Sequence, residues 1–142
     1  MRGHMIYREM RIDDYSAAYK LWENTEGMGL SAADSKQEIT RYLNRNPGLS
    51  QICEDVNGSI AGTALCGHDG RRGFLYHVAV SKSHRGQGIG RELVRRCLNK
   101  LHEEGIAKCH LMVIGDNELG QEFWRGLGWL YRDGIALYSK DT

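Results

Sequence analysis

The segment from Val78 to Arg96 constrains the fold of this chain more than any other part of the sequence. It begins at the end of an apolar run, Phe74 to Val80, which is typical of a strand buried on both faces. Glycines at positions 86, 88 and 90 follow, and they open a long amphipathic helix predicted from Gly88 to Glu104. A buried strand joined through a glycine turn to such a helix predicts a domain that combines a sheet with helices.

Hydrophobic periodicity and turn residues predict the remaining elements. Asp13 is expected to cap a first helix, and Ser31 is expected to open a second helix that ends before Pro47. Asn57-Gly58 predicts one hairpin and Asp133-Gly134 a closing hairpin. The predicted strands span residues 6–11, 49–55, 60–67, 74–80, 108–114, 129–132 and 135–139, and the last helix spans residues 117–127. The order β-α-α-β-β-β-α-β-α-β-β predicts an α/β fold, a mixed sheet with helices on both faces.

Composition narrows the class of protein. No linker or repeat interrupts the chain, which predicts a single domain over residues 5–142, and residues 1–4 are interpreted as a cloning remnant. The formal net charge of +1 argues against a nucleic-acid-binding protein. No apolar stretch reaches the roughly 18 residues that a membrane-spanning helix needs. The four cysteines lie in apolar runs without metal-ligand spacing, so we expect no metal site and a reduced, cytoplasmic setting.

The glycine turn has the properties of an anion-binding site. Because glycine lacks a side chain, main-chain N–H groups can converge on a phosphate, and the following helix N-terminus adds unsatisfied donors. A nucleotide P-loop would need a lysine directly after the last glycine, whereas Gly90 is followed by Arg91. The dinucleotide motif would need a glycine at position 91. Both motifs fail, which leaves a pyrophosphate site of another kind or a structural turn without a ligand.

The pattern Arg85-x-x-Gly88-x-Gly90 resembles the coenzyme A signature of the GNAT N-acetyltransferases. The predicted order of elements is similar to that family over almost the whole chain, and Gly128-Trp129 matches a position where the family often has Gly-Phe. The segment from Asp69 to Gly73 is similar to a small bacterial subgroup, the YpeA-like proteins. The resemblance implies a GNAT-like fold and a bacterial N-acetyltransferase that uses acetyl-CoA as co-substrate.

The resemblance also implies which residues bind the cofactor. The family splays the strand at 74–80 from the strand at 108–114, and the pantetheine arm pairs with the first of them. One main-chain N–H there would polarise the thioester carbonyl. Lys82, Arg85 and Arg91 lie closest to the turn and are basic candidates for the phosphates. The full expected set is Val78, Ala79, Val80, Arg85, Gly86, Gln87, Gly88, Ile89, Gly90, Arg91, Asn117 and Trp124.

The proton-transfer groups are less well defined. Many family members protonate the departing thiolate with a tyrosine at the position of Trp124, and an indole N–H cannot give up its proton as a phenol does. Three alternatives follow: another tyrosine (Tyr76 or Tyr131), water, or a protein that binds acetyl-CoA with little catalysis. Strand alternation predicts that Tyr76 and His77 point to opposite faces. The resemblance implies that Tyr76 is the one that points toward the acceptor. His77 is either a candidate base or a hydrogen-bonded core residue.

The acceptor is not encoded in any motif. The resemblance implies direct transfer of the acetyl group to a primary amine, which a peptide N-terminus, a lysine, a polyamine, an aminoglycoside or a small metabolite would supply. The resemblance places Glu23 and Glu26 where the family shapes its acceptor site, but both are better explained as ordinary surface carboxylates. A non-catalytic acetyl-CoA-binding module is the alternative function. Nucleic-acid and membrane partners are not expected, and a homodimer is compatible with the resemblance.

Overall fold

The computed structural model describes residues 4–142, which divide into two compact units. The first unit ends at Met112 and the second begins at Val113. Residues 1–3 of the predicted cloning remnant lie outside the described residues. None of the helices in residues 4–142 is both long and apolar enough to cross a bilayer.

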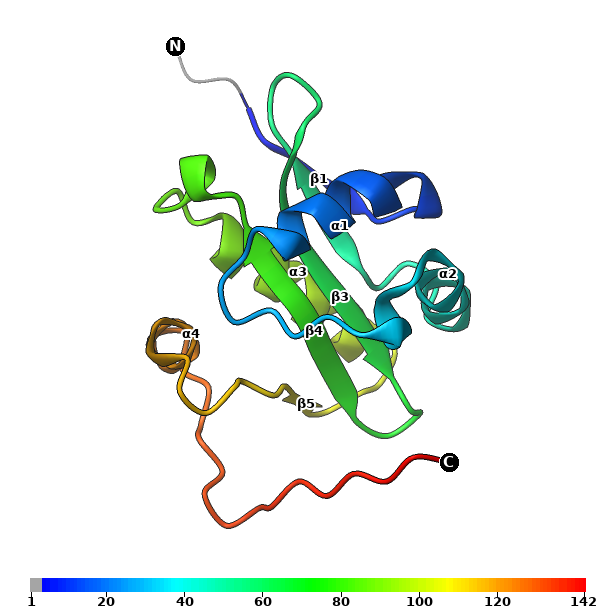
Figure 1. Cartoon of the computed structure of the whole chain (residues 1–142), viewed down its shortest axis with the longest axis vertical. Helices are drawn as coiled ribbons and strands as arrows, with labels where there is room; N and C mark the ends of the chain where they lie inside the picture. Colours follow the sequence, from blue (N-terminus) through cyan, green and yellow to red (C-terminus); the bar gives the residue numbers. More distant parts are fainter. Residues whose placement is uncertain (1–3) are drawn as a thin grey trace. The chain divides into compact units, whose positions relative to one another are not determined.

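The first unit contains a sheet of five strands whose order in space follows their order in the chain (Figure 1). Neighbouring strands from β1 to β4 pair antiparallel, and β5 pairs parallel with β4, so the predicted mixed sheet is confirmed. β5 is much shorter than the predicted strand at 108–114. The strands are β1 (Ile6–Glu9), β2 (Gln51–Glu54), β3 (Ile60–His68), β4 (Gly73–Val80) and β5 (Cys109–His110).

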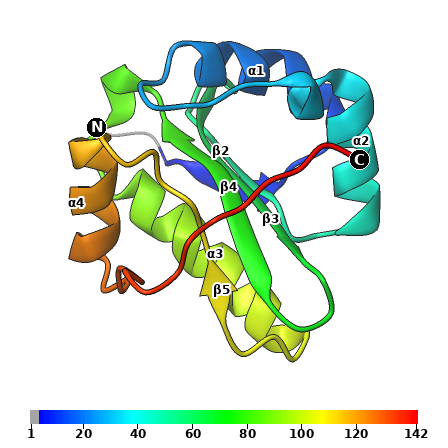
Figure 2. The same ribbon diagram turned by 60° about the horizontal axis from the view of Figure 1, so that its bottom comes forward.

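Helices cover both faces of this sheet, as predicted. Adjacent residues of β3 show the two faces, because successive side chains of a strand point in opposite directions. A Cβ at Gly62 would lie 2.9 Å from Ile89, whereas the Thr63 hydroxyl accepts a 2.9 Å hydrogen bond from the Trp22 indole. Figures 1 and 2 show the same division, with α1 (Tyr15–Glu23) and α2 (Lys36–Arg45) on one face and α3 (Ile89–Glu103) on the other. Trp22 is fully buried in the core between α1 and the sheet.

Two predicted helix starts are wrong by a few residues, because short 3-10 turns precede both helices. Asp13 does not cap α1, since the turn η1 (Ile12–Asp14) comes first. Ser31 caps the turn η2 (Ala32–Asp34) instead of α2. The α2 helix begins one turn later, where the Ser35 hydroxyl accepts a 3.2 Å hydrogen bond from the Glu38 N–H. In each case a local polar contact stabilises a tight turn before the helix begins.

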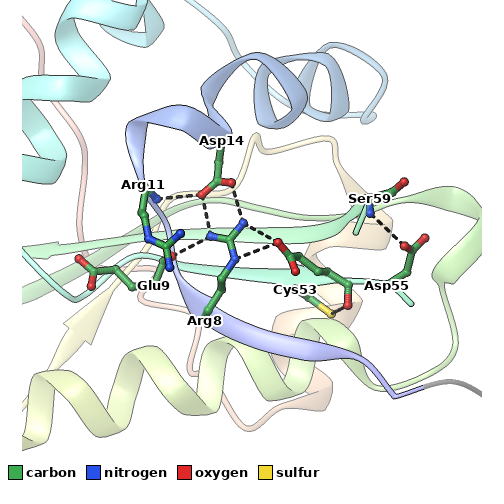
Figure 3. A network of polar contacts seen from close by, with 8 residues as sticks. Arg8, Glu9, Arg11, Asp14, Cys53, Asp55 and Ser59 are labelled. Carbon is green, nitrogen blue, oxygen red and sulfur yellow. Dashed lines mark hydrogen bonds and ion pairs between the residues drawn. The ribbon is translucent and has the colours of Figure 1, made fainter. Parts of the chain in front are cut away.

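An ion-pair network links β1 to η1 and to β2 (Figure 3). The Arg8 guanidinium of β1 lies 2.7 Å from Asp14 in η1 and 2.7 Å from Glu54 in β2. Burial alone would raise the pKa of Asp14, but hydrogen bonds from Arg8 and from the Arg11 N–H outweigh it and hold that pKa below its usual range. Arg8 therefore positions η1, and with it the start of α1.

The second unit contains the helix α4 (Glu118–Gly126), with both ends capped. The Asn117 side chain accepts a 3.1 Å hydrogen bond from the Gly120 N–H. At the other end Gly128 has φ 88°, and the Trp129 N–H donates to the Trp124 carbonyl at 3.0 Å. The Trp124 and Trp129 rings pack at 5.1 Å, which is the hydrophobic contact that accompanies this type of helix end.

The predicted closing hairpin, 129–132 with 135–139, is wrong. The structure has a turn at its centre, where the Ile135 N–H donates to the Arg132 carbonyl at 3.3 Å, but neither flank forms a strand in the described chain. The sequence signals for the turn and for alternation are local, whereas a two-stranded hairpin is at best marginally stable without further strands. The last two elements of the described chain are therefore β5 and α4, and the two predicted strands after α4 are absent from it.

Candidate functional site

A bulge interrupts β4 beside its partner β3. Thr63 pairs with Ala79 and Leu65 pairs with Tyr76, so β4 uses one residue more than β3 over this stretch. His77 at the bulge has φ 48°, and it is the one non-glycine residue of the described chain with positive φ. A bulge of this kind usually places glycine there, since a side chain at positive φ costs about 1–3 kcal/mol.

The bulge overturns the expectation that Tyr76 and His77 point to opposite faces. The Tyr76 ring lies 6.3 Å from that of Tyr42 in α2, and the His77 ring lies 4.6 Å from that of Trp22 in α1. Both side chains therefore lie on the face covered by α1 and α2. Simple alternation fails because the extra residue turns the backbone between them.

Three contacts hold His77 in its unusual conformation. Its Nε2 lies 2.5 Å from a carboxylate oxygen of Asp34, at the end of η2. Its carbonyl accepts a 2.8 Å hydrogen bond from the Thr63 hydroxyl, which in turn accepts the hydrogen bond from Trp22. The ring itself packs on the indole. His77 and Asp34 are both largely buried, with side chains 13% and 9% exposed.

The far edge of β4 is open over most of its length. Only Gly73 and Phe74 pair with β5 in residues 4–142, at Cys109 and His110. Beyond Phe74 the β4 strand continues to Val80, and no strand within the described part of the chain pairs with it on that side. The expected separation of these two strands is therefore present, and no strand of the first unit's described residues pairs with the edge of β4 beside the bulge.

The glycine turn follows β4 directly. The Ser81 N–H donates to the Ala61 carbonyl at 2.8 Å, and a 3-10 turn, η3 (Lys82–His84), leads into the glycines. Gly86 and Gly88 have φ of 80° and 79°, and no atom lies within 4 Å of a Cβ built on either. Gly88 is the N-cap of α3, and no side chain caps this helix. The first N–H groups of α3 thus remain available to an anion.

Two of the three basic residues expected at the phosphates are engaged in ion pairs. Glu26 lies 3.3 Å from Lys82 and 3.1 Å from Arg85. A hydrogen bond from its own main-chain N–H, followed by those from Arg85 and Lys82, lowers the pKa of Glu26 to about 2. Arg85 also donates to the Val80 carbonyl at 3.1 Å. Arg91 is exposed and makes no ion pair with any residue from 4 to 142.

The remaining expected site residues belong to the second unit, and their contacts there are structural. Asn117 caps α4, and the Trp124 ring packs edge-on against Phe123 and Trp129. Tyr131 lies in the irregular segment after α4. The structure brings together Val78 to Val80 and Arg85 to Arg91 within the first unit.

Sequence reasoning missed the bulge, the Asp34 contact and the ion pairs of Glu26. No residue type announces the bulge, because histidine replaces the glycine that would signal positive φ. The Ser31-x-x-Asp34 spacing does indicate a capping box, and it is present: the Ser31 N–H donates to Asp34 at 3.0 Å. The other oxygen of the Asp34 carboxylate contacts Nε2 of His77, which lies 43 positions later in the chain.

Comparison with known proteins yields one family. A model of the acetyltransferase (GNAT) family matches residues 10–129. An acetyltransferase of Pectobacterium atrosepticum is 40% identical over 133 residues, which cover 94% of this chain and 93% of that protein. The structure of Ard1 from Thermoplasma volcanium has a TM-score of 0.78 at 18% identity, covering 89% of this chain and 82% of that one. A predicted acetyltransferase of Clostridium acetobutylicum, solved with acetyl-CoA, has a TM-score of 0.73 at 21% identity and covers 96% of both chains.

Proposed function

The chain belongs to the GNAT family of acetyltransferases, and from this premise we propose that it moves the acetyl group of acetyl-CoA directly to a primary amine. The observation that carries the proposal is the arrangement of β4, whose open edge and bulge lead without interruption into the uncapped glycine turn. The extended thioester arm can lie along the open edge of β4, and the pyrophosphate can be bound by the glycine turn.

The glycine turn is proposed to bind the pyrophosphate through main-chain N–H groups. Gly86 and Gly88 leave the approach open, and the free N–H groups at the start of α3 belong to Ile89, Gly90 and Arg91. The Ile89 side chain is 2% exposed and packs into the core, so only its main chain can contact a ligand. Gln87 is exposed and contributes its main chain in the same way. Arg85 and Arg91 would add charge to this cradle.

Main-chain groups of Val78, Ala79 and Val80 are proposed to bind the pantetheine arm and the thioester carbonyl. The support is the open edge of β4, together with the bulge, which leaves main-chain groups outside the regular ladder. A fixed N–H aimed at the carbonyl oxygen stabilises the negative charge that develops there when the amine attacks.

Tyr76 is the proposed donor of a proton to the departing thiolate, with Tyr131 as the second candidate. Burial raises the pKa of the Tyr76 phenol above its usual value, so the hydroxyl keeps its proton at neutral pH. The roles of Asn117, Trp124 and Tyr131 are proposed on the family resemblance. A cytoplasmic setting is proposed because Cys53, Cys66, Cys97 and Cys109 are all free thiols.

The test combines binding with turnover. Calorimetry measures the affinity for acetyl-CoA, and a thiol reagent measures coenzyme A release in the presence of spermidine, lysine, an aminoglycoside and peptides with a free N-terminus. Acetyl-CoA binding with amine-dependent thiol release supports the proposal. Binding without release for every amine supports the alternative, a non-catalytic acetyl-CoA-binding module. Absence of acetyl-CoA binding contradicts both.

A further inference from the structure

We propose that His77 accepts the proton of the attacking amine and that Asp34 orients the imidazole for this task. The inference rests on the proposed acetyl transfer and assigns a base to it. It starts from the Nε2–Asp34 contact of 2.5 Å, on a residue whose backbone forms the β4 bulge.

The contact with Asp34 determines which nitrogen of the ring is basic. A carboxylate oxygen has no proton to donate, so the hydrogen of this bond is carried by Nε2 of His77. The lone pair of the neutral ring then resides on Nδ1. This nitrogen makes no hydrogen bond within residues 4–142, and it is not among the buried polar atoms that lack a partner. In the neutral ring Nδ1 is therefore the acceptor nitrogen, it is not fully enclosed by the protein, and its orientation is fixed by a carboxylate on the opposite side of the ring.

Nδ1 also lies close to the place where the reaction is proposed to occur. It is bonded to the ring carbon nearest the main chain, so it remains within a few bonds of the backbone of residue 77. That backbone is the bulge, and the next residue is Val78, the first of the residues proposed to hold the thioester. An amine that attacks a carbonyl bound there releases its proton within reach of Nδ1, directly or through one water.

The environment of His77 is suited to a residue that must keep one orientation. Asp34 is itself held in place at two points. The second oxygen of its carboxylate accepts a hydrogen bond from the Ser31 N–H, and its main-chain carbonyl accepts a 2.7 Å hydrogen bond from the Tyr15 hydroxyl. The indole of Trp22 covers one side of the ring. A bulge that only shaped the main chain would be served by glycine, which adopts positive φ freely. A histidine at this φ, with a carboxylate bound to its ring, points to a role for the side chain.

The reaction balances with this assignment. The amine nitrogen forms a bond to the thioester carbon, the carbon–sulfur bond breaks, and the thiolate leaves with the electron pair. The proton lost by the nitrogen passes to Nδ1 of His77, where Asp34 stabilises the resulting imidazolium. The thiolate takes up one proton, from Tyr76 or from water, and the imidazolium returns its own to solvent or to that donor. The products are an acetylated amine and coenzyme A.

The test uses His77→Gly and His77→Asn in the full chain, with the amine that gives the highest turnover in the wild-type panel. Glycine keeps the positive φ and removes the ring, and asparagine tolerates the same φ and keeps a polar side chain without a base. We expect kcat to fall about 100-fold or more in both variants, as is usual for loss of a general base. The dissociation constant for acetyl-CoA should change by less than about threefold, because the main chain of the bulge remains.

Chemical rescue distinguishes a base from a purely structural residue. Added imidazole should restore kcat of His77→Gly at least about tenfold, since it can occupy the vacated space and accept a proton. In the wild type, ¹⁵N NMR of the neutral ring should show a proton on Nε2 and none on Nδ1. Asp34→Asn, which preserves the shape of the η2 turn, should shift this tautomer and lower kcat.

Three results would overturn the assignment of His77 as the base. Retained kcat in His77→Gly would overturn the assignment of His77 while leaving acetyl transfer intact. Loss of acetyl-CoA affinity together with kcat, without rescue by imidazole, would also overturn it, because the ring would then serve only to hold the bulge. A wild type that binds acetyl-CoA but acetylates no amine would overturn the proposed function, and the base with it.

Discussion

Gly88 and His77 have the same kind of backbone conformation for opposite reasons. Both have positive φ, 79° and 48°, and both lie where acetyl-CoA is proposed to bind. At Gly88 no atom of the first unit beyond the two neighbouring residues lies within 4 Å of a built Cβ, and positive φ carries no steric cost because glycine has no side chain. At His77 the conformation is held by the contacts of the side chain and carbonyl. The glycine turn has its conformation because a side chain is absent, whereas a histidine can have positive φ at the bulge because other residues hold it there.

The difference predicts that the two positions respond differently to substitution. An added side chain damages the glycine turn, whereas the bulge, with histidine in place, is destabilised when the Thr63 hydrogen bond to its main chain is removed.

Gly88→Val should abolish acetyl-CoA binding. A β-branched side chain at φ 79° is strained by about 1–2 kcal/mol, and it would project into the space in front of the α3 N-terminus. We expect an affinity at least about 100-fold weaker by calorimetry, against a decrease of about twofold or less for Gln87→Ala, whose exposed side chain is not required. Full affinity in Gly88→Val would remove the glycine turn from the cofactor site.

Thr63→Val should destabilise the bulge by removing a hydrogen bond from β3. Thr63 is fully buried, and its hydroxyl serves both the Trp22 indole and the His77 carbonyl. Removal of the hydroxyl leaves two buried polar groups without a partner, which we expect to lower the free energy of unfolding by about 2–4 kcal/mol. Thr63→Ser keeps the hydroxyl and is the matched control in denaturant titration. Equal stability of the two variants would mean that the bulge does not depend on this contact.

Glu26→Gln should strengthen acetyl-CoA binding modestly. The Glu26 carboxylate is paired with Lys82 and Arg85, and its removal frees two positive charges beside the proposed phosphate site. Because the pairs are exposed, we expect only about a two- to fivefold gain at low salt, disappearing near 1 M salt. Weaker binding in Glu26→Gln would show that the carboxylate supports the turn more than it competes with the ligand.

The acid titration of Glu26 should differ from that of an ordinary glutamate. Its own main-chain N–H, Arg85 and Lys82 lower its pKa to about 2, so the ion pairs persist while other glutamates protonate near pH 4. A lowered pKa adds stability above the unfolded value, and this contribution is lost as the pH falls toward about 2. Carboxyl-resolved NMR of the wild type measures the midpoint. A midpoint near 4 would show that these pairs do not form in solution.

The same contrast explains what could be predicted from the sequence. The glycine turn was predicted because the residue that permits the conformation is also the residue that signals it. Strand and helix positions around it were predicted because β3, β4 and α3 are long and strongly patterned, and the structure confirms them to within one or two residues.

The bulge could not be predicted, because its partners come from elsewhere in the chain. Positive φ at a histidine is stabilised by Asp34 and Thr63, which lie 43 and 14 positions away. The closing hairpin was wrong for a related reason. A turn at Asp133-Gly134 is a local property, but strands on either side of it need neighbours that the sequence pattern does not specify.

The absence of a side chain at Gly62 in β3 determines how closely α3 packs against the sheet. A Cβ at Gly62 would lie 2.9 Å from Ile89, 3.0 Å from Leu93 and 3.1 Å from the Ala79 carbonyl. The first turn of α3 therefore rests directly on the backbone of β3, and the helix cannot move closer or be lifted without changing how far its free N–H groups stand from the end of β4. Gly62 therefore determines how closely α3 packs on β3, and with it the distance between the proposed pyrophosphate site and the end of β4.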